Sequence, residues 1–76
     1  MSDNIQKSES FKRVASKRVD NIIKSIRSLS NCSNTNNYRY NEDDVNKMVR
    51  AIRDEVKVME TLFRKNLGDK NDTFNF

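Results

Sequence analysis

Two runs of apolar residues with helical spacing constrain the fold of this chain more than any other feature. The first run recurs at alternating steps of four and three and consists of Ala15, Val19, Ile22, Ile26 and Leu29. The second run has the same steps and consists of Val45, Val49, Ile52, Val56, Met59 and Phe63. Such spacing places apolar side chains on one face of an α-helix. The sequence therefore predicts an all-α fold with two amphipathic helices, at about residues 9–30 and 42–67.

Residues that favour helix ends flank both segments. Ser8 or Ser10 has the hydroxyl group needed to cap the start of the first helix. Asn41 is a favourable N-cap for the second helix, and the carboxylate of Asp44 suits the positive end of the helix dipole. Gly68 suits the left-handed backbone conformation that ends many helices. These signals place the ends of the second helix more firmly than those of the first.

The connection between the predicted helices spans residues 31–40, whereas most helix connections in bundles have about two to eight residues. Four of its residues are asparagines, which form local turns readily, so the segment can be an ordered loop that closes a hairpin. Its amide, phenol and guanidinium groups can instead hold a polar ligand. Both interpretations predict an antiparallel helical hairpin within residues 1–68. Residues 69–76 are expected to form a flexible tail, whose Phe74 and Phe76 can alternatively dock on a neighbouring subunit.

The small size of the chain predicts self-association. It has 76 residues, of which 34% are hydrophobic, so one copy can bury little apolar surface. Folds of this size usually need a disulfide, a metal or an oligomer, and one cysteine without any histidine supplies neither of the first two. We therefore expect no metal and no cofactor, and a homo-oligomeric helical bundle, the simplest being a dimer with four helices.

Charge is distributed unevenly between the two halves. Residues 1–30 contain seven basic and three acidic residues, while residues 31–76 contain eight of each. Four basic residues of the first predicted helix lie opposite its apolar stripe and form what we call the basic ridge, consisting of Arg13, Lys17, Lys24 and Arg27. The ridge is either a solvated face that maintains solubility or a surface for an anionic partner.

Two charged residues border the apolar stripes. Arg18 follows Phe11 by seven positions, and Glu55 lies between Met48 and Leu62. In an antiparallel hairpin they come within a turn of each other, as a partly buried ion pair that fixes the helix register. Alternatively, Arg18 is available at a subunit interface, where its guanidinium can bind a phosphate with two hydrogen bonds.

Residues around the connection resemble a family of short bacterial and phage two-helix proteins. In that family the connection reads approximately N-L-S-N-R-S-N-Y-E-Y before an acidic helix start. The matching positions here are Arg18, Val19, Lys24, Ile26, Arg27, Leu29, the connection at 31–40, Asp44 and Val45. The similarity spans about residues 11–63, with Thr35 and Arg39 where the family tends to have arginine and glutamate. This resemblance implies a helical hairpin in a bacterial or phage-infected cell.

The function expected from these features is non-enzymatic binding. The chain has no histidine to act as a base and no glycine-rich phosphate loop, and Cys32 has no neighbouring base. We expect an oligomer that sequesters an anionic small molecule such as a host signalling nucleotide, which would inhibit bacterial defence. The expected ligand-binding residues are Arg18, Lys24, Arg27, Asn34, Tyr38, Arg39 and Tyr40. The alternative is a basic interaction module that binds nucleic acid or inhibits an acidic protein.

A cytoplasmic location is expected as well. No signal-peptide pattern follows Met1, and no apolar run approaches the ~20 residues that span a bilayer. We therefore expect no membrane partner.

Overall fold

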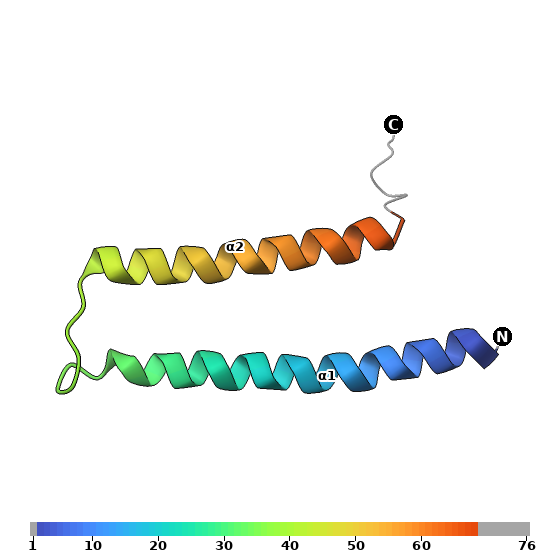
Figure 1. Cartoon of the computed structure of the whole chain (residues 1–76), viewed down its shortest axis with the longest axis horizontal. Coiled ribbons are helices and arrows are strands. Elements are labelled where there is room, and N and C mark those ends of the chain that lie inside the picture. Colours follow the sequence, from blue (N-terminus) through green and yellow to red (C-terminus); the bar gives the residue numbers. More distant parts are fainter. Residues whose placement is uncertain (1, 69–76) are drawn as a thin grey trace. The chain divides into compact units, whose positions relative to one another are not determined.

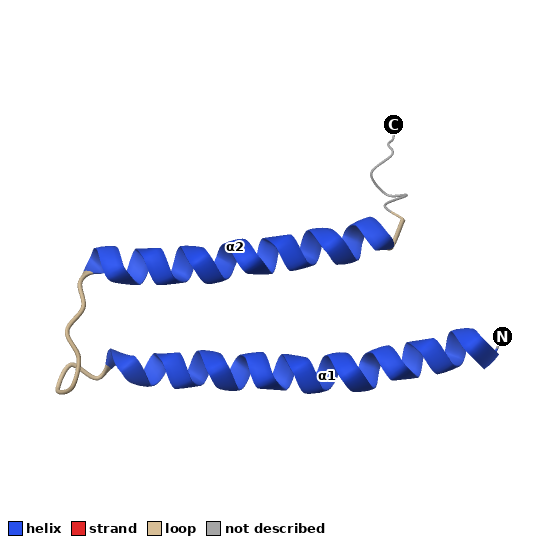
Figure 2. Ribbon diagram, in the orientation of Figure 1, coloured by secondary structure: helices blue, strands red, loops and turns tan. Residues whose placement is uncertain are grey.

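The computed structural model describes residues 2–68, and all regular structure in this range is helical (Figure 1). Helix α1 spans Ser2–Ser30, the short 3-10 helix η1 spans Asn31–Ser33, and helix α2 spans Glu42–Asn66. Figure 2 shows the two long helices and the loop that connects them. The order of elements confirms the predicted all-α class. The predicted tail at 69–76, with Phe74 and Phe76, lies outside the described residues.

The chain divides into two units, Met1–Arg39 and Tyr40–Phe76. The first unit contains α1, η1 and most of the connection, and the second contains α2. Neither α1 nor α2 has an apolar stretch long enough to cross a bilayer.

Helix α1 begins about seven residues earlier than the sequence predicts. Ser8 and Ser10 are therefore helical residues and not N-caps. The segment 2–8 contains no proline or glycine that would stop a helix. It also has only one apolar residue, Ile5, so the periodic signal that reveals the rest of α1 is absent there.

Both ends of α2 agree with the sequence prediction to within one residue. At its start, the backbone N–H of Asp44 donates to Asn41 Oδ1 at 2.8 Å, and the backbone N–H of Asn41 donates to Asp44 Oδ2 at 3.0 Å. This reciprocal capping box satisfies two backbone donors that the helix leaves unpaired. At its end, Gly68 has a φ of 93°, which a residue without a Cβ adopts at little cost. The backbone N–H of Gly68 donates to the carbonyl of Lys65 at 3.1 Å.

Neither unit has a buried core. Among residues 4–68, whose side-chain exposure is described, none is buried. Val45 and Val49 are half-buried, and the other large apolar residues are 37% to 76% exposed. Most residues of both apolar stripes are exposed, including Ile22 and Ile26 of α1 and Ile52 and Met59 of α2. Each unit by itself therefore leaves its principal apolar surface in contact with water.

We predict that the capping box contributes measurably to stability. Asn41→Ala should lower the free energy of unfolding by about 0.5–2 kcal/mol, because the backbone N–H of Asp44 then loses its acceptor. Asn46→Ala is the matched control, because it replaces an asparagine inside α2 with a better helix former and should not destabilise. Thermal unfolding followed by circular dichroism compares the two variants. Equal stability of both would contradict the assigned role of the cap.

Candidate anion-binding site

Helix α1 carries three of the seven predicted site residues, and they do not share one side. With 3.6 residues per turn, Lys24 and Arg27 are separated by about 60° around the axis, while Arg18 and Arg27 are about 180° apart. Arg18 borders the apolar stripe, and the other two belong to the basic ridge. Helix α1 therefore presents two separate cationic surfaces. One pocket on this helix cannot hold all three side chains.

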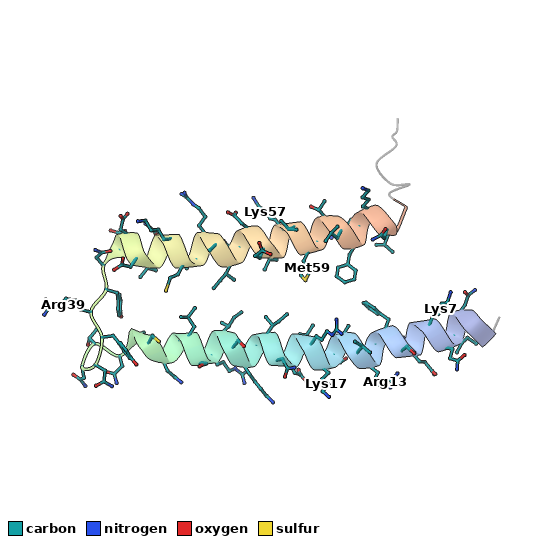
Figure 3. All side chains as sticks on the ribbon, in the orientation of Figure 1. Lys7, Arg13, Lys17, Arg39, Lys57 and Met59 are labelled. Atoms are coloured by element: carbon teal, nitrogen blue, oxygen red, sulfur yellow. The ribbon has the colours of Figure 1, made fainter. Side chains whose placement is uncertain are left out.

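The basic ridge is exposed along its whole length. Figure 3 shows Arg13 and Lys17 leaving α1 on the same side. Arg13 and Arg27 are about 21 Å apart along the helix axis, from the rise of 1.5 Å per residue. The spacing from Lys17 and Lys24 also places Asp20 on this side, where its carboxylate partly offsets the positive charge. The ridge is an extended, exposed row of cations along one side of α1.

The loop after α1 is built around Asn34. Its carbonyl oxygen accepts from the backbone N–H groups of Asn37 at 3.2 Å and Tyr38 at 3.0 Å. Its side-chain Oδ1 accepts from the backbone N–H of Asn36 at 2.9 Å, which is an Asx turn. The backbone N–H of Asn34 donates to the carbonyl of Asn31 at 3.4 Å. Asn34 therefore has a local turn role, as the ordered-loop interpretation expects, and its Nδ2 group takes no part in this turn.

Aromatic and cationic side chains follow this turn directly. Tyr38 is 53% exposed and Tyr40 is 43% exposed, and Arg39 between them is exposed as well. Figure 3 shows Arg39 projecting from the loop. We call Asn34, Tyr38 and Arg39 the loop cluster, because they belong to one unit, whereas Tyr40 belongs to the second unit. A phenol ring offers a stacking surface for a base, and a guanidinium offers paired donors to a phosphate.

Helix α2 contributes an ion pair and a groove, neither of which involves a predicted site residue. Arg64 Nη2 lies 2.8 Å from Glu60 Oε2, as expected for oppositely charged residues four positions apart. A shallow groove on α2 is lined by Lys57, Val58, Thr61 and Leu62. None of these four is a predicted site residue. The signal that could have revealed the groove is the spacing of Val58 and Leu62 by four residues, which extends the apolar surface beyond the main stripe.

Cys32 is a free, exposed thiol in η1. Within residues 2–68 no three or more His, Cys, Asp or Glu side chains come together as metal ligands would.

Comparison of the chain with protein-family models, with curated proteins and with solved structures finds no match. A functional assignment therefore depends on the chemistry of the residues described above.

We predict that the Asn34 side chain stabilises the loop through its oxygen. Asn34→Ala should lower the free energy of unfolding by about 0.5–1.5 kcal/mol, because the N–H of Asn36 loses its acceptor. Asn34→Asp keeps an acceptor oxygen at this position, so its free energy of unfolding should fall by less. Asn36→Ala is the control, since it leaves the backbone N–H donor in place. Thermal unfolding of the three variants makes the comparison, and equal losses for Asn34→Ala and Asn34→Asp would contradict the Asx turn.

Proposed function

We propose that this chain is a small, non-enzymatic protein that forms homo-oligomers and sequesters an anionic small molecule such as a signalling nucleotide. The observation that carries the proposal is the position of Arg18 beside an uncovered apolar stripe. A subunit that covers the stripe leaves Arg18 at the edge of the interface. There its guanidinium is partly shielded from water, so a hydrogen-bonded pair with a phosphate gains strength.

The loop cluster supports a ligand that has a base as well as a phosphate. Tyr38 and Arg39 are exposed and adjacent, and they directly follow the turn that Asn34 holds in place. Stacking of a base on an aromatic ring contributes about 1–3 kcal/mol in single-stranded nucleic-acid complexes. Because Arg18 and the loop cluster lie at different places in the unit, we propose that a complete site combines residues from more than one subunit.

The biological setting of the proposal comes from the resemblance of residues 11–63 to short bacterial and phage proteins. In a phage-infected bacterium, an abundant cytoplasmic protein that sequesters a host signalling nucleotide would prevent that nucleotide from activating its receptor. The protein would then act against a bacterial defence response. Binding alone suffices for this role, so no catalytic group is needed.

The basic ridge favours a second candidate function. Arg13, Lys17, Lys24 and Arg27 form an exposed row on one side of α1, which suits a phosphate backbone or the acidic surface of another protein. Contacts with a nucleic-acid backbone are numerous and individually weak, and their strength falls steeply with added salt. This behaviour separates the second function from the first.

We predict that a cyclic nucleotide binds through a few directed contacts. Arg18→Ala should weaken the binding by about 1.5–3 kcal/mol, because a charge-assisted pair of hydrogen bonds is lost. Lys12→Ala is the matched control, since it removes one positive charge from α1 at a residue with no proposed contact. Arg18→Lys keeps the charge and loses the planar pair of donors. Calorimetric titrations with cyclic nucleotides and with short duplex DNA, each at two salt concentrations, measure these effects.

Two results would contradict the nucleotide proposal. Equal losses for Arg18→Ala and Lys12→Ala would mean that the protein responds only to net charge. Strongly salt-dependent binding of unrelated DNA sequences, without binding of nucleotides, would favour the basic interaction module.

A further inference from the structure

Helix α2 has a second apolar strip beside its main stripe. The strip consists of Met48, Ala51, Val58 and Leu62, and we call it the flank strip. Met48, Val58 and Leu62 are 43%, 53% and 56% exposed, so their side chains are largely open to water. With 3.6 residues per turn, the centre of the flank strip is turned by about 100° from the centre of the main stripe. The shallow groove on α2 lies at its far end, between Val58 and Leu62.

The two apolar strips together need two neighbouring helices. A single packed helix covers an apolar stripe about 100° wide, while the main stripe and the flank strip together span about 180° of α2. In a four-helix bundle each helix contacts two others, which matches this requirement. Within residues 2–68 the chain has one other long helix, α1, so at least one neighbour of α2 comes from another molecule.

We propose that two copies of the chain associate through their flank strips, with the two α2 helices antiparallel. This inference depends on the self-association in the proposed function and assigns its contact surface. A two-fold axis lets one strip cover another identical strip, so no further surface is required. Helix α2 also has six acidic and six basic residues, whereas α1 has seven basic and three acidic ones. Contact between two α2 helices therefore avoids the repulsion that two α1 helices would experience.

The charges at the ends of α2 select the antiparallel direction. Its first turn contains Glu42, Asp43 and Asp44, and its last turn contains Arg64 and Lys65. In an antiparallel pair each acidic first turn lies beside the basic last turn of the other copy. In a parallel pair the like charges lie together, which is unfavourable.

The position of Glu55 selects the register. Glu55 lies in the middle of the flank strip, so an axis at this residue would bring two identical carboxylates together, which is unfavourable at an interface. An axis at about Arg53 instead sets Glu55 opposite the small Ala51 of the second copy. The same register sets Met48 opposite Val58 of the second copy.

The first test introduces a charge into the strip. Val58→Asp should increase the dissociation constant for self-association at least tenfold, because the new carboxylate would be removed from water in the contact. Asn46→Asp is the matched control, since it adds the same charge on the side of α2 away from the flank strip and the groove and should change the constant by less than threefold. Sedimentation equilibrium measures both constants, and circular dichroism checks that both variants remain helical.

The outcomes of this test separate the inference from the proposed function. If the unmodified chain is oligomeric and Val58→Asp behaves like Asn46→Asp, the flank strip is not the contact and only the inference is overturned. If the unmodified chain is a monomer, the proposed oligomer and the inference both fail.

The second test does not depend on weakening the contact. In a Cys32→Ser background, single cysteines at 48, 51 and 58 are treated with a short bismaleimide. The proposal expects Ala51→Cys, near the axis, to cross-link with itself. Met48→Cys and Val58→Cys should cross-link when mixed and not separately. Self cross-linking at all three positions would show a parallel pair, and no cross-linking at any of them would show a different neighbour for the strip. Either result would overturn the proposal.

Discussion

The exposed apolar stripes are the constraint on which the other features of this protein depend. Isolated helices in water are marginal even when their residues favour helix, so most helical stability in proteins comes from packing an apolar face. Burial stabilises by about 25 cal/mol for each Å² of apolar surface removed from water. Within each unit the chain removes very little apolar surface from water, because none of the side chains at 4–68 is buried. Cover for α1 and α2 must therefore come from outside each unit, and the proposed oligomer supplies it.

Helical geometry separates the cations of the candidate site within the first unit. Arg18 lies beside the stripe of α1, Lys24 and Arg27 lie on the opposite side, and Arg39 projects from the loop. These cations do not converge within the unit that contains them. Assembly can bring Arg18 of one subunit to the loop cluster of another and shield both from water, which strengthens contacts with a phosphate. Binding and self-association are thus linked in the proposed function.

The sequence predicted the features that depend on interactions between residues close together in the chain. The helix-forming pattern and the pair Asn41 and Asp44 identified α2 to within a residue, because a capping box and a periodic stripe act over a few neighbouring positions. The start of α1 was missed because segment 2–8 is polar and carries neither a periodic signal nor a stop signal. The sequence left two interpretations of Asn34 open, a residue that forms a turn and a residue that binds a ligand. An asparagine residue looks the same in the sequence in both cases. Whether the site residues come together depends on the neighbouring subunits. The spacing of apolar residues along one chain does not specify how those subunits pack.

Native mass spectrometry of the protein purified from cells tests the central claim most directly, because it reports the number of subunits and any retained small molecule in one spectrum. Each chain has a mass of 9.0 kDa. We expect a discrete multiple of this mass, with additional mass corresponding to a phosphate-containing ligand when the ligand is present in the cells. A helical, stably folded species at the mass of one chain, at concentrations where circular dichroism shows cooperative unfolding, would contradict the account.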